Sequence, residues 1–227
     1  MPISAQAKNL HLIWRAGFGP HAEQLAHLQD ESPQKLYQQL HNTSSAGSRT
    51  IDVANAKIRS LLSNSMEPRS LSEAERRALR RQNRDDIKNL NLAWLNEMVQ
   101  SSAQLNEKMA LFWHGHFACR NMNIIYQQAL LDVVRKNALG HFGDLLREVS
   151  KSAAMLNFLN NNQNRKGHPN ENFAREVMEL FTMGTGNYSE TDVKESARAF
   201  TGWGSNVTTT GVPPAFPAWS AEVEMTA

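Results

Sequence analysis

The stretch from His168 to Trp203 constrains the fold of this chain most strongly, because it carries the start and stop signals of two consecutive helices. Pro169 fits the first turn of a helix, where its missing N–H costs nothing. Gly184 supplies the left-handed geometry that ends a helix. Ser189 and Asp192 then have the spacing of a capping box, which opens a second helix that runs towards the end of the stretch. The pattern therefore predicts two short helices separated by a turn.

The first of these two helices is amphipathic. At about 100° per residue, its main apolar side chains fall within one arc of roughly a third of a turn, and these are Phe173, Val177, Leu180 and Phe181. Glu171, Arg175 and Glu179 form a separate stripe. Such a stripe is commonly a solvated face, whose i,i+4 pairs contribute about 0.2–0.5 kcal/mol each. Glu179, however, lies where a carboxylate opposes the helix dipole, so the stripe is also a candidate polar site.

Helical spacing, capping residues and glycine stops recur over residues 4–202, with no β alternation and no repeat of fixed period. We therefore predict an all-α protein, an irregular multi-helix globular domain of roughly ten helices. Trp14 is expected on the apolar side of the first helix, and Ser70 with Glu73 is expected to cap the longest. Besides the two helices above, the expected helices cover residues 4–16, 21–29, 33–40, 51–62, 70–100, 105–119, 124–139, 141–149 and 153–159.

The predicted helical domain covers residues 1–203. It contains one expected flexible linker near residues 42–49, where the sequence NTSSAGSR offers turn formers and nothing to bury. A second polar loop, NNNQNRKGH at 160–168, is also rich in turn formers. From Ser205 the chain is rich in Pro and Thr and loses its helical period, so residues 204–227 are expected to form an extended or disordered tail.

The charge of the chain is balanced, with 24 Lys and Arg against 22 Asp and Glu and a net charge of +2. This balance supports neither a nucleic-acid partner nor an anionic membrane surface. The most basic segment, residues 67–88, also holds five acidic residues against seven basic ones, which favours a solvated helix face over a nucleic-acid footprint. The single cysteine, Cys119, is expected to be a small buried apolar residue, because nothing marks it as a low-pKa thiol.

Two histidines, His114 and His116, flank Gly115 within an aromatic segment. Histidines on one helix bind a metal together at i,i+3 or i,i+4 spacing, whereas i,i+2 spacing places the two rings about 200° apart. A continuous helix therefore cannot chelate one ion with both. A structural or hydrogen-bonding role is favoured, and a metal-binding or acid–base role for one of them stays open.

No motif of a common cofactor site occurs in the sequence. It has no cysteine pair, phosphate loop, nucleophile elbow, dinucleotide fingerprint or zincin motif, so no cofactor is assigned and the question of a metal is left open. No segment reaches the roughly 18 apolar residues of a transmembrane helix, and the N-terminus lacks the pattern of a signal peptide. We expect a soluble, cytoplasmic protein if the chain starts at Met1, and an exported or periplasmic one if the true start lies upstream.

A series of short motifs runs through the chain. PNENFARE at 169–176 is followed by ELFT at 179–182, Gly184, NY at 187–188, DV at 192–193 and TGW at 201–203. This series resembles the signature of a large, mostly bacterial family catalogued as domain of unknown function DUF1800. Segments at 11–19, 112–117 and 137–146 are also similar to the family pattern, so the resemblance covers most of the chain. It implies a mainly helical protein without an established activity, and many relatives resemble exported proteins.

Two further expectations come from this resemblance. In the family the domain continues past the TGW triplet, which implies that residues 204–227 are the start of a missing C-terminal part. Asn160 stands where relatives usually have Asp. If that acidic position matters in the family, Asn160 removes a charge from the site in this chain.

Two functional hypotheses follow from the sequence. In the first, the protein is a hydrolase-like enzyme whose acid, base or metal ligand is Glu171 or Glu179. Arg175 would hold an anionic substrate group, and His114 or His116 would assist. In the second, the protein is a non-catalytic helical binding or assembly module, and the Glu-Arg-Glu stripe is an internal brace. Its partner would be another exported or envelope protein encoded nearby.

Overall fold

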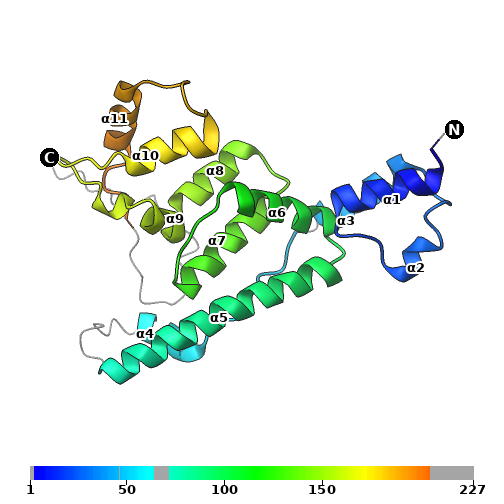
Figure 1. The fold of residues 1–227 in the computed structure, drawn as a ribbon, viewed down its shortest axis with the longest axis horizontal. Helices are drawn as coiled ribbons and strands as arrows, with labels where there is room; N and C mark the ends of the chain where they lie inside the picture. Colours follow the sequence, from blue (N-terminus) through cyan, green and yellow to red (C-terminus); the bar gives the residue numbers. More distant parts are fainter. Residues whose placement is uncertain (1–2, 46, 64–71, 205–227) are drawn as a thin grey trace. The chain divides into compact units, whose positions relative to one another are not determined.

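The computed structural model describes residues 3–45, 47–63 and 72–204 of the chain (Figure 1). These residues form α-helices, one 3₁₀ turn and one π-helix, and they contain no β-strand. The all-α prediction is therefore confirmed. Ser70 and, apart from Gly204, the expected tail at 204–227 lie outside the described residues. No described helix has both the length and the apolar character needed to cross a membrane.

Most of the helices lie within a few residues of the predicted positions. In chain order the α-helices are α1 (Ala5–Ala16), α2 (Ala22–Leu25), α3 (Pro33–Ser45), α4 (Ala56–Ser63), α5 (Glu73–Gln100), α6 (Gln104–His116), α7 (Ile124–Asn137), α8 (Phe142–Lys151), α9 (Ala153–Phe158), α10 (Asn172–Glu176) and α11 (Glu190–Ala199). The 3₁₀ turn η2 (Asn161–Gln163) follows α9, and the π-helix η3 (Val177–Thr182) continues α10.

The chain folds into two compact units, and each is built from several separate segments. Unit 1 takes residues up to Ile51 together with Asn91–Ala118 and Leu131–Val149, and unit 2 takes the rest. The long helix α5 and the helix α7 each contribute residues to both units. The domain boundary inferred from the sequence, residues 1–203, stays a prediction.

Unit 1 has its own apolar core, in which α1, α3 and α6 pack against one another. The loop after α2 is attached to α1 by Asn9, whose buried amide donates to the carbonyl oxygens of Leu28 (2.6 Å) and Glu31 (2.8 Å). The buried apolar side chains of this unit include Ile13, Leu28, Trp94, Met98, Ala110, Phe117, Leu131, Val134, Ala138, Leu145 and Val149.

Two expectations for unit 1 are wrong. Residues 42–45, the first half of the linker predicted for 42–49, belong to α3. Ser44 is buried there and accepts a hydrogen bond from the Asn106 N–H at 3.3 Å. Trp14 is 56% exposed rather than inward, and its ring covers Gly19. A Cβ atom at Gly19 would meet the ring at 3.0 Å, and the φ of +107° also favours glycine there.

Unit 2 begins with an extended segment where the sequence pattern predicted a helix from residue 51. The backbone N–H groups of Val53 and Asn55 donate to the side chains of Gln128 (2.8 Å) and Asp86 (2.9 Å), and the helix α4 starts only at Ala56. These side-chain acceptors, distant in sequence, replace the helical bonds that the local pattern favours. The buried apolar side chains of unit 2 include Ile58, Leu90, Ile124, Leu130, Met155, Leu156, Phe173, Met178, Phe181 and Val193.

The cap of α5 lies two residues after the predicted one. The hydroxyl of Ser72 accepts from the Glu75 N–H at 3.3 Å, and the Glu75 carboxylate accepts from the Ser72 N–H at 2.9 Å. This is the reciprocal pattern of a capping box. The same Ser-x-x-Glu spacing occurs in both frames, at 70–73 and at 72–75, and the helix begins after the second serine.

Candidate functional site

The candidate polar stripe lies on α10 and η3, and α11 packs against α10 in the same unit (Figure 1). Their shared apolar cluster consists of Ala174, Met178, Val193 and Ala197, with Tyr188 and Phe200 packed at its edge. The ring of Phe173 meets that of Phe200 edge-on, with centroids 5.0 Å apart. The pair of helices therefore has an apolar centre, and its polar residues lie around the edge.

Helix α10 starts three residues later than predicted, because Pro169 was expected in its first turn and the helix begins at Asn172. The Asn170 side-chain oxygen accepts from the Asn172 N–H at 3.0 Å, while the Asn170 N–H donates to the side chain of Asn164 at 2.9 Å. Asn170 thus caps the start of the helix and is fixed by the preceding polar loop.

The second half of the predicted helix is a π-helix, and this changes which side chains face the core. The Met183 N–H donates to the Met178 carbonyl at 2.8 Å, five residues back. A π-helix turns less per residue than an α-helix, so positions counted at α spacing drift around the axis. Met178 is consequently buried, whereas Leu180, predicted on the apolar arc, is 59% exposed.

The predicted stop and cap signals between the two helices are confirmed. Gly184 has a φ of +76°, and its N–H donates to the Met178 carbonyl at 3.1 Å. Ser189 and Asp192 form the capping box that opens α11, with reciprocal bonds of 2.8 and 3.2 Å. α11 ends at Ala199, before Gly202, whose N–H donates instead to the Asn164 carbonyl.

The Arg175 side chain lies between two carboxylates, that of Glu171 directly before α10 and that of Glu190 at the start of α11. Its Nη2 atom is 3.2 Å from Glu171 Oε2, one turn earlier, and 2.7 Å from Glu190 Oε2 at the start of α11. Its Nη1 atom donates to the other Glu190 oxygen at 2.8 Å. We call these three residues the Arg175 clasp. The Arg175 side chain is 33% exposed and that of Glu190 is 68% exposed, so the clasp lies at the protein surface.

The third residue of the predicted stripe, Glu179, has different partners. The hydroxyl of Tyr188 donates to Glu179 Oε2 at 2.6 Å, and the Thr185 hydroxyl lies 3.4 Å from Oε1. The stripe is therefore divided, because Glu171 and Arg175 belong to the clasp and Glu179 holds the turn between η3 and α11. Glu190 is the partner that sequence reasoning missed, since no helical period relates it to Arg175.

The pKa shifts agree with this pairing. The hydrogen bond to Glu190 is the main cause that raises the pKa of Arg175, and the same bond is the main cause that lowers the pKa of Glu190. The pKa of Tyr188 is raised, mainly because its hydrogen bond to Glu179 favours the protonated phenol. At neutral pH Arg175 and Glu190 therefore form an ion pair, and Tyr188 is a hydrogen-bond donor.

A group of buried asparagines, which we call the asparagine hub, holds the end of α11. Asn164 donates to the Ala197 carbonyl at 2.8 Å and to the Asn161 side-chain oxygen at 3.2 Å. Asn161 donates to the carbonyls of Phe200 (3.3 Å) and Trp203 (2.9 Å). An amide side chain carries both donors and an acceptor, so two asparagines satisfy several carbonyl groups that α11 leaves open at its end.

Asn160 directly precedes this hub in the chain. It is the position at which relatives in the family usually have an aspartate. Its backbone is left-handed, with a φ of +59°, the one positive φ among the described non-glycine residues. Asn and Asp adopt this conformation more readily than other side chains. The backbone requirement therefore gives a conformational reason for an Asn or Asp here. The asparagines at 160–162 and 164 are the signal for this hub in the sequence, but turn formers of this kind predict only a loop.

The two candidate histidines belong to unit 1, whereas the Arg175 clasp belongs to unit 2. On the continuous helix α6, the His114 ring lies 5.1 Å from that of Trp94, and the His116 ring lies 4.7 Å from that of Phe117. The two rings thus contact different partners, as i,i+2 spacing predicts. Burial lowers the pKa of His114.

Cysteine chemistry and a metal cluster are the two other chemical possibilities. Burial raises the pKa of the half-buried Cys119 thiol to about 12, which disfavours the thiolate. Over the described ranges, no group of three or more His, Cys, Asp or Glu side chains is arranged to hold a metal ion.

The comparisons with curated proteins and with solved structures gave no match. The profile of the family described as "Protein of unknown function (DUF1800)" matches residues 11–221. Because this match covers most of the chain, the protein belongs to the DUF1800 family.

Proposed function

We propose that this protein is a helical binding or assembly module in which the Arg175 clasp is a structural brace. The observation that carries the proposal is the pairing of one guanidinium with carboxylates on both helices, Glu171 beside α10 and Glu190 on α11. With both carboxylates bound, Arg175 has little capacity left for an anionic substrate group. A charge-assisted pair that joins two helices fixes their relative position.

The surface that this brace would present lies on the π-helix and the turn after it. Leu180 and Met183 are 59% and 44% exposed, and both are large apolar side chains. Leu180 lies on η3 and Met183 directly follows it, and Glu179, whose hydrogen bond to Tyr188 holds the turn, precedes Leu180 in the chain. Exposed apolar residues on a rigid element are suited to contact another protein. A partner protein that binds Leu180 and Met183 is therefore part of the proposal.

Amide hydrogen exchange tests the brace directly. Arg175→Gln removes the charge and keeps a polar side chain, and we expect faster exchange along α11 because its tie to α10 is lost. The matched control is Arg198→Gln, which breaks an exposed ion pair with Glu195 inside α11. Exposed pairs add little to global stability, so local exchange is a more sensitive readout than the melting temperature. Equal exchange in both variants would contradict the brace.

Photo-cross-linking tests the binding role. A photoreactive side chain at position 180 should give one protein adduct in cells that express the protein naturally, whereas the exposed position 194 on α11 should not. Combined with Arg175→Gln, the adduct at position 180 should weaken, because the surface loses its support. An adduct that forms equally from both positions, or that ignores Arg175→Gln and responds to Arg198→Gln, would count against the module.

An acid–base enzyme is a second candidate, and the Glu179–Tyr188 bond is the observation that favours it. A carboxylate 2.6 Å from a tyrosine hydroxyl can hold or accept its proton. In this alternative Glu179 acts as acid or base, and Glu171 or Arg175 of the same unit assists. A hydrolase screen with ester and phosphoester substrates tests it, since Glu179→Gln should abolish any turnover found while the exchange of α11 changes little.

A further inference from the structure

A row of basic residues follows one face of the N-terminal half of α5, within unit 2. At about 100° per residue, positions i, i+3, i+4, i+7 and i+11 share an arc about 100° wide. The members are Arg77, Arg80, Arg81, Arg84 and Lys88, and all are exposed. The opposite side of the same helix carries the buried Asp86 and Leu90. We call the four arginines the arginine stripe.

Three of the four guanidinium groups have no partner in the described part of the chain. Arg77 pairs with Glu73 in the first turn of α5, whereas no hydrogen bond or ion pair involves the side chains of Arg80, Arg81 or Arg84. The exposed Arg147 and Arg198 differ, since each pairs with a carboxylate, at 3.0 and 2.8 Å. Like charges at i,i+3 and i,i+4 destabilise a helix, so repulsion within the stripe lowers the stability of α5.

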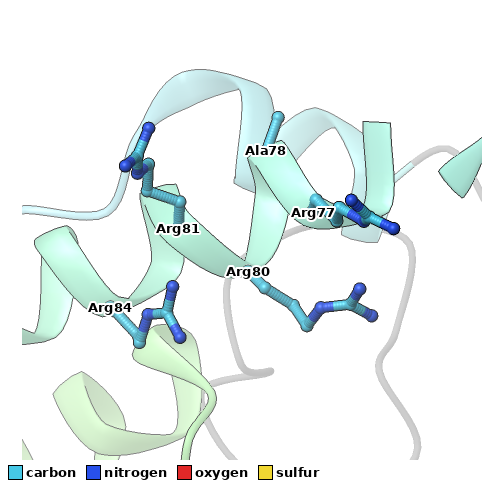
Figure 2. A pocket seen from close by; sticks show the side chains of 5 residues that line it. All are labelled: Arg77, Ala78, Arg80, Arg81 and Arg84. Carbon is cyan, nitrogen blue, oxygen red and sulfur yellow. The ribbon is translucent and has the colours of Figure 1, made fainter. Parts of the chain in front are cut away.

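The stripe also lines a pocket. Arg77, Ala78, Arg80, Arg81 and Arg84 border a space of about 470 Å³. Figure 2 shows the four side chains leaving two successive turns of α5, with Arg80 and Arg84 on the same side of the helix as drawn. A volume in the range of about 300–1,000 Å³ is typical of small-ligand sites. Such sites are mostly apolar, whereas four of the five described residues that line this space are arginines.

We propose that the arginine stripe binds a ligand with two or three linked phosphate groups. Guanidinium groups donate paired hydrogen bonds that match the oxygens of a phosphate. Four of them, within about 10 Å along the helix axis, require several negative charges close together. A chain of linked phosphates supplies that charge density in a small volume, and it would relieve the repulsion among Arg80, Arg81 and Arg84.

The lining favours a phosphate chain over a nucleic acid. Among the described residues that line the pocket there is no aromatic side chain on which a base could stack, and single-stranded nucleic acids are bound through such stacking. The phosphate chain can be free or part of a nucleotide. The arginines would bind the phosphate groups alone, and a free phosphate chain and a nucleotide both contain these groups.

Calorimetric titration of the full chain with sodium tripolyphosphate, pyrophosphate, orthophosphate and ATP tests the proposal. We expect one site per chain, with tripolyphosphate bound more tightly than orthophosphate. The double variant Arg80→Gln/Arg84→Gln should raise the Kd for tripolyphosphate by at least about tenfold, since charge-assisted bonds are lost. The control Arg147→Gln/Arg198→Gln removes the same net charge from arginines outside the stripe and should leave the Kd within about twofold.

The outcomes separate the proposal from a general charge effect. Equal weakening in both double variants, several sites per chain, or orthophosphate bound as tightly as tripolyphosphate would each overturn it. Poly-glutamate or duplex DNA bound in preference to tripolyphosphate would overturn it too, because the site would then serve an acidic protein or a nucleic acid. Equal affinity for ATP and tripolyphosphate supports a free phosphate chain, and tighter ATP binding that still depends on Arg80 and Arg84 supports a nucleotide source.

Discussion

Glu107 and Arg135 form a buried ion pair between α6 and α7. The Arg135 Nε atom lies 3.1 and 3.0 Å from the two Glu107 oxygens, Nη2 lies 2.7 Å from Oε1, and neither side chain is exposed. Trp94 donates to Glu107 Oε2 at 2.9 Å, and Arg135 also donates to the Arg49 carbonyl. This single network links α5, α6, α7 and the segment after α3. It is an internal brace of unit 1. Its side chains are far more buried than those of the Glu-Arg-Glu stripe, for which the sequence suggested such a role.

Removing one member of this pair should be costly. Arg135→Met leaves the Glu107 carboxylate buried without its main partner, and we expect the free energy of unfolding to fall by about 3–5 kcal/mol. Urea denaturation followed by circular dichroism measures the change. The matched control is Arg147→Gln, which breaks an exposed pair with Asp144 on α8 and should cost under about 1 kcal/mol.

The double variant Glu107→Leu/Arg135→Met separates the buried charge from the packing. Apolar side chains of similar volume can replace a buried pair with little loss, so the double variant should be more stable than Arg135→Met alone. A double variant that loses the sum of both single effects would show that the two side chains are not coupled, and it would contradict the pair. A small effect of Arg135→Met would contradict the assigned network.

The stability of unit 1 should depend on pH through His114. Burial lowers the folded pKa of His114 below its ordinary value of 6.5, so its contribution is present above pH 6.5 and lost as the pH falls through the lowered folded pKa. His114→Phe keeps an aromatic ring beside Trp94 and cannot be protonated. We expect this variant to lose less stability than the parent between pH 7 and about pH 5. The exposed His11→Gln is the control and should follow the parent.

Cys119 should react slowly in the folded protein. With a thiol pKa raised to about 12 by burial, almost no thiolate is present at pH 8. Reaction with a thiol-specific disulfide reagent should therefore be slower than in urea-unfolded protein by on the order of a hundredfold or more. The chain has a single cysteine, so one absorbance trace reports it alone. Equal rates in folded and unfolded protein would show that the thiol is not protected.

Local signals in the sequence predicted the helices well. The Ser189–Asp192 capping box and the Gly184 stop depend on residues within a few positions of each other, and both are confirmed. Pairings between distant residues were not predictable in this way. Glu107 lies 28 residues from Arg135, and nothing in a helical period connects them.

The candidate site shows the same division. Its i,i+4 part, Glu171 with Arg175, follows from helical spacing, whereas the stronger partner Glu190 is brought close only when α11 packs on α10. The π-helix was missed for another reason. A period of 3.6 residues was assumed throughout, and this placed Leu180 in the core, although the wider winding of η3 turns it out. The pairing of Arg175 with Glu190 therefore depends on tertiary packing, which the local sequence pattern does not contain.

The asparagine hub should hold the C-terminal end of α11 in place. Asn164→Ala leaves the Ala197 carbonyl and the Asn170 N–H without their side-chain partner, and Asn164 is buried. Each buried group left without a hydrogen bond costs about 1–3 kcal/mol. We expect a loss in this range or above it by urea denaturation, together with faster amide exchange in the last turn of α11.

The control for the hub is Asn187→Ala. Asn187 also donates its side-chain amide to a backbone carbonyl, that of Met183 at 2.7 Å, but it is exposed and water can replace the bond. This variant should therefore cost under about 0.5 kcal/mol and leave the exchange of α11 unchanged. If Asn164→Ala and Asn187→Ala behave alike, burial of the hub does not matter and the end of α11 is held by its apolar contacts. If only Asn164→Ala loosens the last turn, the polar loop before α10 fixes the C-terminal end of α11.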